Sequence, residues 1–246
     1  MSLEDKIAVV TGALGGIGTA ICQRLAADGA TVIGTCHPAD ADKANAWIEE
    51  QGGAIEAVAG DVSDAEDAAR MMQQIVDRHG RVDIVVNCAG ITRDTTMKKM
   101  SAEQWDAVID TNLSSMFYVT QPVWNGMLER GYGRVINISS VNGQRGQFGQ
   151  ANYSAAKAGV HGFTMTLAYE GAAKGVTANT VSPGYVETAM TAAMREDVRD
   201  AIVSGIPMRR MGIPEEIAHA VAFLADDRST YITGANVPVN GGLFIH

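Results

Sequence analysis

The chain has 246 residues, with 28 Asp and Glu against 19 Lys and Arg, so its formal net charge is −9. This length fits one large α/β domain, and the negative charge argues against nucleic acid or an anionic membrane surface as a partner. The first residues are acidic and no apolar run approaches ~18 residues, so we expect neither a secretory signal nor a membrane span. The sequence predicts no metal site, and three unpatterned cysteines favour the reducing cytoplasm: Cys22, Cys36 and Cys88.

A glycine-rich turn follows the first apolar run. Residues 6–11 (KIAVVT) have the profile of a buried parallel strand, and a helical pattern covers residues 17–28. Between them lie Gly12, Gly16 and Gly18, a spacing that differs from the G-x-G-x-x-G dinucleotide fingerprint. Backbone N–H groups at a helix start favour a pyrophosphate. We therefore expect a phosphate cradle, and the alternative is a tight turn that only brings helix and sheet together.

The second apolar run ends where a dinucleotide fold contacts the adenosine ribose. An acid at this point binds a free 2′-hydroxyl, whereas an arginine accommodates a 2′-phosphate. Position 14 is a leucine, and residues 36–42 contain no arginine but do contain Asp40 and Asp42. These charges favour NADH over NADPH. Two basic side chains nearby could still meet a phosphate: His37 and Lys43.

Strand-like runs alternate with helical patterns along the whole chain, at residues 6–11, 31–35, 55–59, 82–86, 134–139, 176–181 and 236–239. This alternation predicts a parallel sheet covered by helices on both faces, with ligands bound beyond the carboxyl ends of the strands. Small and polar motifs stand at those ends: Asp61–Val62, Asn87–Gly90, Ser140 and Pro183–Gly184. Two capping pairs predict helix starts: Ser63 with Glu66, and Ser101 with Gln104.

Tyr153 and Lys157 stand four residues apart at the start of a predicted helix, so they share one face. An adjacent ammonium favours the phenolate and lowers the pKa of a tyrosine, which would make Tyr153 a candidate general acid and base. An isolated pair of this kind is more typical of an ordinary amphipathic helix. Asn112 lies inside another predicted helix, where it either faces solvent or holds a water near Ser140.

Together these motifs resemble the short-chain dehydrogenase/reductase family over essentially the whole chain, residues 1–246, taken as one domain. The resemblance implies a doubly wound Rossmann fold with a seven-stranded parallel sheet, a nicotinamide cofactor, a homotetramer and a catalytic tetrad of Asn112, Ser140, Tyr153 and Lys157. Cys88 departs from the family, which commonly has a second Asn there. The implied cofactor-binding residues are Gly12, Leu14, Gly15, Gly16, Ile17, Gly18, His37, Asp61, Val62, Asn87, Ala89, Gly90, Tyr153, Lys157, Pro183, Gly184, Val186 and Thr188.

Within the family, three segments most resemble the acetoacetyl-CoA reductases of polyhydroxybutyrate synthesis: residues 90–94 (GITRD), 105–113 (WDAVIDTNL) and 137–154 (NISSVNGQRGQFGQANYS). This implies reduction of acetoacetyl-CoA to (R)-3-hydroxybutyryl-CoA. Residues 185–212 are less regular, Met-rich and charged, which predicts a mobile substrate lid. An NADPH preference among relatives opposes the charge argument for NADH, so both cofactors stay open. The implied substrate-binding residues are Asp94, Lys99, Ser140, Gln147, Phe148, Gln150, Tyr153 and Tyr185.

Two other functions remain open. A 3-oxoacyl-ACP reductase would perform the same chemistry on a protein-bound thioester, with Arg130 and Lys174 as part of a docking surface. A non-catalytic nicotinamide-binding redox sensor would need no turnover, and the intact tetrad argues against it. Candidate contacts for CoA phosphates are Lys99, Arg93, Arg145, Arg195 and Arg209, and we expect no chemical role for His79 or His161.

Overall fold

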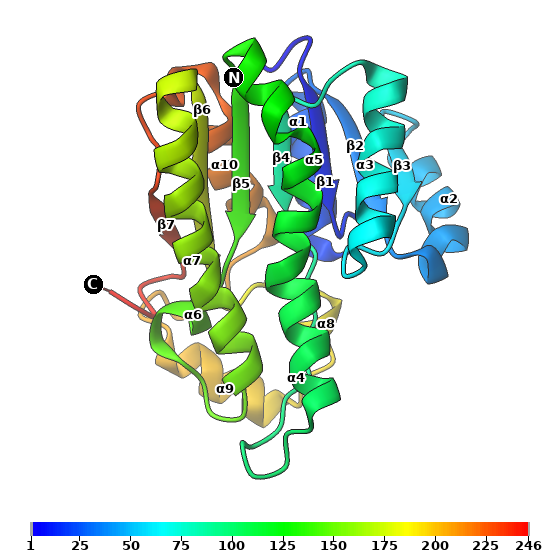
Figure 1. Cartoon of the computed structure of the whole chain (residues 1–246). Helices are drawn as coiled ribbons and strands as arrows, with labels where there is room; N and C mark the ends of the chain where they lie inside the picture. The colour runs from blue at the N-terminus through cyan, green and yellow to red at the C-terminus, as the bar shows by residue number, and fades with distance from the viewer. Residues whose placement is uncertain (1, 246) are drawn as a thin grey trace.

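Seven strands form one parallel sheet in the computed structural model, which describes residues 2–245. The strands are β1 (Ile7–Thr11), β2 (Thr31–Cys36), β3 (Ile55–Ala59), β4 (Ile84–Asn87), β5 (Gly133–Ile138), β6 (Val176–Pro183) and β7 (Asn236–Val239). Their order is β3-β2-β1-β4-β5-β6-β7, so the chain builds outward from β1 to one edge and then from β4 to the other (Figure 1). This arrangement confirms the predicted doubly wound fold. Two strands, β3 and β7, have the predicted boundaries, and no other strand boundary differs by more than two residues.

Helices cover both faces of the sheet and gather beyond its carboxyl edge. They are α1 (Gly16–Ala27), α2 (Ala41–Glu50), α3 (Ala65–His79), α4 (Ala102–Ile109), α5 (Ser115–Arg130), α6 (Asn142–Arg145), α7 (Ala151–Gly171), α8 (Ala189–Ala192), α9 (Glu196–Gly205) and α10 (Pro214–Ala225). In Figure 1, α3, α5 and α7 stand in front of the sheet, and α4, α6, α8 and α9 lie below the strand ends. Within residues 2–245 no helix is both long and apolar enough to cross a membrane.

Successive side chains on the central strands enter two separate cores. Val10 packs in one core with α1 and α10, whereas Val9 packs in the other with α3, α5 and α7. On β4, Ile84 and Val86 join the first core and Val85 joins the second. Because side chains of a strand alternate between faces and both faces are covered, these strands appear in the sequence as continuous apolar runs.

The two predicted capping pairs have different outcomes. Ser101 and Gln104 form the expected capping box at the start of α4, with both reciprocal hydrogen bonds present. At the start of α3 the cap is Asp64, whose carboxylate accepts from the backbone N–H of Asp67 at 2.8 Å. The cap predicted at Ser63 was wrong by one residue, because two neighbouring side chains could serve and the backbone places the second at the helix start.

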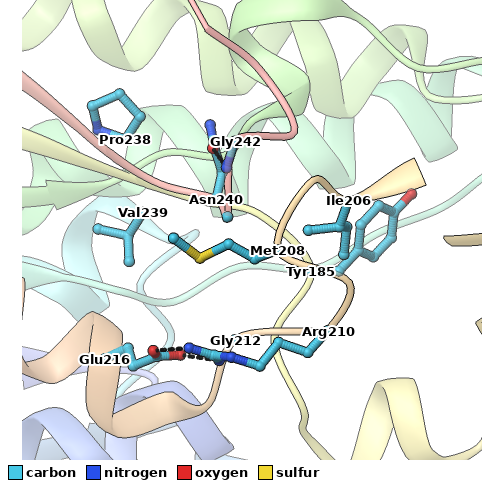
Figure 2. A pocket seen from close by; sticks show the side chains of 11 residues that line it. Tyr185, Ile206, Met208, Arg210, Gly212, Glu216, Pro238, Val239, Asn240 and Gly242 are labelled. Atoms are coloured by element: carbon cyan, nitrogen blue, oxygen red, sulfur yellow. Dashed lines mark hydrogen bonds and ion pairs between the residues drawn. The ribbon is translucent and has the colours of Figure 1, made fainter. Parts of the chain in front are cut away.

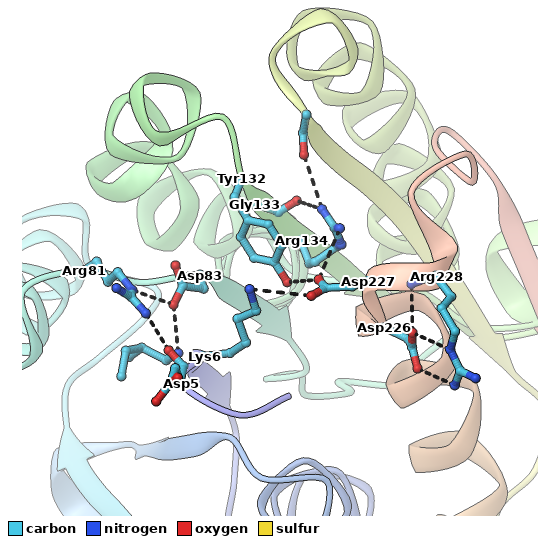
Figure 3. Close-up of polar contacts among 12 residues, drawn as sticks. Asp5, Lys6, Arg81, Asp83, Tyr132, Gly133, Arg134, Asp226, Asp227 and Arg228 are labelled. Carbon is cyan, nitrogen blue, oxygen red and sulfur yellow. Dashed lines mark hydrogen bonds and ion pairs between the residues drawn. The ribbon is translucent and has the colours of Figure 1, made fainter. Parts of the chain in front are cut away.

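A polar cluster closes the opposite, amino edge of the sheet (Figure 3). The Arg134 side chain is 1% exposed, donates to two backbone carbonyls and lies 4.4 Å from the centroid of the Tyr132 ring. The ammonium of Lys6 lies 3.8 Å from the same ring, and the Tyr132 hydroxyl donates to Asp227 at 2.8 Å. Because ligands of such folds bind at the other edge, this cluster has a structural role.

Candidate active site

The glycine turn after β1 is shaped by close approaches that exclude side chains. Gly12 has a φ of 67°, and a Cβ there would lie 2.8 Å from Ala89 Cα. A Cβ on Gly18 would overlap the carbonyl oxygen of Gly12, and one on Gly16 would lie 3.1 Å from Thr188 Cγ2. The turn therefore packs directly against the segments that follow β4 and β6, which brings three predicted cofactor motifs together.

The first turn of α1 carries no side-chain cap. Its N-cap is Gly15, which leaves the backbone donors of the first turn facing the loop, and no acidic residue lies in that turn. Leu14 and Ile17 beside it are partly buried against the core. The open N–H groups and the positive end of the helix dipole fit the pyrophosphate of a dinucleotide.

His37 and Asp61 face each other at the ends of β2 and β3, with His37 Nε2 3.5 Å from Asp61 Oδ2. The backbone N–H of Ala39 donates to His37 Nδ1, so the ring proton belongs on Nε2. Partial burial raises the pKa of Asp61, but hydrogen bonds from Ser63 and the nearby His37 outweigh it and lower that pKa below its usual value. Asp61 is therefore an ionised acceptor at the predicted adenosine end of the site.

The acidic residues after β2 differ in their availability. Asp40 pairs with Lys43 at 2.6 Å, and this hydrogen bond lowers the pKa of Asp40. Asp42 lies exposed in the first turn of α2. This ion pair occupies Lys43, which could otherwise bind a 2′-phosphate. It also neutralises part of the negative charge that favours NADH.

The end of β4 is fixed from two sides. The backbone N–H groups of Cys88 and Ala89 both donate to Thr11 Oγ1 at 3.0 Å, which ties the strand end to β1. Asn87 Nδ2 donates to Thr120 and Asn137 inside the core. The amide hydrogens of Asn87 are therefore used within the fold, so its predicted cofactor contact would not use them.

Tyr153 and Lys157 lie on one face of α7, beside Ser140 at the end of β5. Lys157 Nζ donates to the carbonyl of Ile138 at 2.8 Å and lies 5.7 Å from the centroid of the Tyr153 ring. Lys157 is 3% exposed, and burial lowers the pKa of its ammonium to about 8. Ser140 makes a hydrogen bond with the Tyr153 side chain. Three members of the predicted tetrad therefore meet at one point.

The pKa of Tyr153 shifts in the opposite direction from our expectation. Burial raises it, the hydrogen bond with Ser140 lowers it, and the Asp94 carboxylate raises it further. Lys157 is not among the groups that shift this pKa, and its ammonium donates to the Ile138 carbonyl instead. A raised pKa keeps the phenol protonated at neutral pH, which suits a proton donor.

Cys88 lies in the same site but has no nucleophilic character. Burial raises the pKa of its thiol to about 11, against a smaller lowering by Lys157. The thiol therefore stays protonated at neutral pH, in agreement with its expected role as a small apolar residue. Among residues 2–245, no group of three or more His, Cys, Asp or Glu could hold a metal ion.

Asn112 completes the predicted tetrad from a π-helical turn, Asp110–Ser114, between α4 and α5. It is fully buried, which excludes the solvent-facing alternative, and its Nδ2 donates to Ile91 and Val108 carbonyls at 2.9 Å. Its Oδ1 is buried without a partner in the described part of the chain, and a Cβ on Gly90 would lie 2.6 Å away. A buried acceptor of this kind requires a donor, so it fits a bound water or a cofactor group.

Two loops carry the predicted substrate residues, and short contacts join them. The backbone N–H of Thr95 donates to the carbonyl of Gly149, and Gln150 Nε2 donates to Asp94 Oδ2 at 2.8 Å. The structure therefore brings Asp94 and Gln150 together beside the tetrad. Three other predicted substrate residues are exposed on these loops: Lys99, Gln147 and Phe148.

A cavity of about 310 Å³ lies between the end of the predicted lid and the C-terminal segment (Figure 2). Met208 lines one side, and an ion pair between Arg210 and Glu216 at 2.6 Å lies along another. Of the predicted substrate residues, Tyr185 alone lines this part of the described structure. The backbone N–H of Gly212 donates to the Tyr185 carbonyl, so the two ends of residues 185–212 are tied together.

Two further residues contact the site, although the sequence reasoning gave them no role. Asn142 Nδ2 donates to Gln150 Oε1 at 2.9 Å. His161 Nε2 lies 3.1 Å from Ser139 Oγ, which itself donates to the carbonyl of Lys157. The position of Asn142 two residues after Ser140, in the quoted loop, was the one signal that could have identified it.

Comparison with known proteins agrees with this geometry. A family model described as enoyl-(acyl carrier protein) reductase matches residues 12–244. The chain belongs to the short-chain dehydrogenase/reductase family. It is 65% identical to an acetoacetyl-CoA reductase of Allochromatium vinosum and 53% identical to one of Cupriavidus necator, each over 98% of this chain and 99% of the relative. It is 46% identical to a 3-oxoacyl-[acyl-carrier-protein] reductase of Vibrio cholerae over 100% of both chains.

These matches confirm the predicted family and the oxidoreductase class. They also confirm a nicotinamide cofactor, without deciding between NADH and NADPH. The glycine turn, the open first turn of α1 and the unpaired Oδ1 of Asn112 all fit such a cofactor.

Proposed function

We propose that this protein reduces acetoacetyl-CoA to (R)-3-hydroxybutyryl-CoA, as a step of polyhydroxybutyrate synthesis. The observation that carries the proposal is the meeting of Ser140, Tyr153 and Lys157 beside the contact between Asp94 and Gln150. The first three residues suit ketone reduction, and the other two supply polar groups for a short 3-oxoacyl thioester. The identity to acetoacetyl-CoA reductases over nearly the full chain supports this substrate.

The residues of the tetrad divide the proton chemistry between them. A nicotinamide cofactor, when bound, would supply the hydride for the ketone carbon. The Tyr153 hydroxyl gives its proton to the alkoxide oxygen that forms there, and Ser140 hydrogen-bonds the same oxygen and stabilises its developing charge. The Lys157 ammonium would bind the ribose of the nicotinamide, and Asn112 would hold a water that returns a proton to the Tyr153 oxygen.

NADH is the cofactor that the charges at the end of β2 support. Asp42 is exposed just beyond β2, Asp61 is ionised just beyond the neighbouring strand β3, and neither position 14 nor residues 36–42 supply an arginine for a 2′-phosphate. The test is a comparison of kcat/KM for NADH and NADPH with acetoacetyl-CoA. A tenfold or greater preference for NADPH would contradict this charge argument without affecting the reaction itself.

Residues 185–212 form a lid over the substrate in this proposal, and the whole chain acts as one domain within a homotetramer. Two short helices, α8 and α9, lie in this segment, and its two ends are tied by the bond between Gly212 and Tyr185. The exposed side chain of Phe148, 88% accessible, would gain an apolar contact when acyl-CoA binds and the lid closes over it.

Side-by-side kinetics on acetoacetyl-CoA and acetoacetyl-ACP test the substrate. We expect the higher kcat/KM on the CoA thioester. A strong preference for the ACP thioester would identify the protein as a 3-oxoacyl-ACP reductase instead. The absence of turnover on either thioester with either cofactor, together with retained cofactor binding, would favour the redox-sensor alternative.

A further inference from the structure

Asn142 connects the catalytic serine to the wall of the substrate site. It lies at the start of α6, and its side chain is 8% exposed. Its backbone N–H donates to Ser140 Oγ at 3.1 Å, while its side-chain Nδ2 donates to Gln150 Oε1 at 2.9 Å. Gln150 in turn donates to Asp94 Oδ2 at 2.8 Å. One residue therefore contacts the reacting centre through its backbone and the substrate wall through its side chain.

The direction of each hydrogen bond in this chain is fixed by chemistry. The Asp94 carboxylate is only an acceptor, so the Gln150 amide must present its Nε2 to Asp94 and its Oε1 to Asn142. Asn142 must then present its Nδ2 as the donor. Gln150 alone could rotate its amide either way, but between these two neighbours only one orientation satisfies both bonds.

Burial makes this arrangement specific. Asn142 is buried, and its second polar atom, Oδ1, has no partner within residues 2–245. Turning the Asn142 amide over would place that oxygen against Gln150 Oε1, and two acceptors in contact there would lose the bond. The three side chains therefore hold one another in a single orientation, although Asp94 itself is exposed.

We propose that Asn142 is a positioning residue that sets the orientation of Gln150 and Asp94 towards the acyl-CoA substrate, a role that rests on the proposed function. Its backbone contact with Ser140 does not depend on the side chain. Replacing the side chain therefore disturbs the substrate wall but leaves the proton chemistry intact. The expected signature is a rise in KM for acetoacetyl-CoA of about tenfold, the scale of one buried hydrogen bond, with kcat changed less than about threefold.

The test reverses the direction of the hydrogen bonds that join Asn142, Gln150 and Asp94. Asn142→Asp places an acceptor where a donor stood, so Gln150 must turn its amide over and then presents its oxygen to the Asp94 carboxylate. Asp94→Asn alone leaves Gln150 in place, since a carboxamide oxygen can still accept from Nε2. In the double variant every hydrogen bond of the series can reverse its direction. The amide at position 94 then donates to Gln150, and Gln150 donates to the carboxylate at position 142.

We expect Asn142→Asp to raise KM about tenfold and the double variant to return KM most of the way to that of Asp94→Asn. The melting temperature of the apoprotein should follow the same pattern. Asn179→Asp is the matched control, because Asn179 is a buried asparagine whose side chain bonds the Ile232 carbonyl and the Ala235 N–H, outside the site. It should lower the melting temperature and leave KM unchanged.

Additive effects of the two substitutions on KM would overturn the proposal, and so would a normal KM in Asn142→Asp. If Asn142→Asp does not fold, Asn142→Ala must show the rise in KM with near-normal kcat, and a normal KM there also overturns it. A wild-type protein that does not reduce acetoacetyl-CoA would contradict the proposed function instead. The two single variants and the double variant would then be compared on the substrate that the wild-type protein does reduce, with the melting temperatures as an independent readout.

Discussion

Lys157→Met should stabilise the apoprotein near pH 7, although it removes the ammonium that we propose for catalysis. Burial lowers the pKa of Lys157 from 10.5 to about 8. At about 1.4 kcal/mol per pKa unit, keeping this lysine charged in the folded state costs about 3 kcal/mol. The variant also loses the hydrogen bond to the Ile138 carbonyl, which costs it about 1 kcal/mol of stability. The net gain of about 2 kcal/mol corresponds to a rise in melting temperature of about 4–8 °C for a chain of this size.

The stability difference between wild type and Lys157→Met should depend on pH. The pKa of Lys157 is lower in the folded than in the unfolded state, so the unfolded chain binds the extra proton between pH 8 and pH 10.5. The free energy of unfolding of the wild type therefore rises relative to that of Lys157→Met as pH increases through that window. The variant's extra stability is fully present below pH 8. Scanning calorimetry at fixed protein concentration from pH 7 to pH 10.5 measures the difference.

Lys98→Met is the matched control, because Lys98 is exposed and its removal should leave the melting temperature unchanged at every pH. A Lys157→Met protein that melts at or below the wild-type temperature at pH 7 would refute the reasoning. A stability difference that stays constant across the window would do the same.

Three further substitutions test other parts of the structure. Gly18→Ala should weaken cofactor binding about tenfold or more in a fluorescence titration, because its Cβ would overlap the Gly12 carbonyl oxygen; unchanged affinity would contradict the packing of the turn. Gly162→Ala is its control: a Cβ there meets nothing within 4 Å on α7, so cofactor affinity should hold and stability should rise by about 0.5–1 kcal/mol. Arg134→Met should lower the free energy of unfolding by about 1–2 kcal/mol, because the buried Gly133 carbonyl and the partly buried Gly175 carbonyl lose the donor that they share, with kcat of the folded enzyme unchanged. A fall in kcat would mean that the amino-edge cluster affects the active site.

The sheet and the tight glycine turn after β1 could be predicted because they depend on local sequence features. A parallel strand covered on both faces is a continuous apolar run, as in Val9 and Val10, whose alternate sides enter different cores. Gly12 and Gly18 are required by close approaches of backbone atoms, and Gly16 packs closely against the Thr188 side chain. Family motifs then predicted the catalytic tetrad, whose four residues lie beyond the carboxyl edge of the sheet.

The features that escaped prediction depend on tertiary contacts. The pKa of Tyr153 rises because of its burial, which the spacing to Lys157 cannot reveal. The role of Asn142 depends on Gln150 folding back from eight residues further along and on Asp94 arriving from another loop. Neither effect leaves a periodic or spacing signal in the sequence.

The most direct test of the account compares wild-type protein with Tyr153→Phe in the reduction of acetoacetyl-CoA, followed by nicotinamide absorbance. The substitution keeps the ring and its packing but removes the proton donor. We predict turnover by the wild type and a loss in kcat of about 10²–10⁴-fold in the variant, the range typical of a positioned general acid. Near-normal turnover by Tyr153→Phe would contradict the central claim that Tyr153 protonates the substrate oxygen.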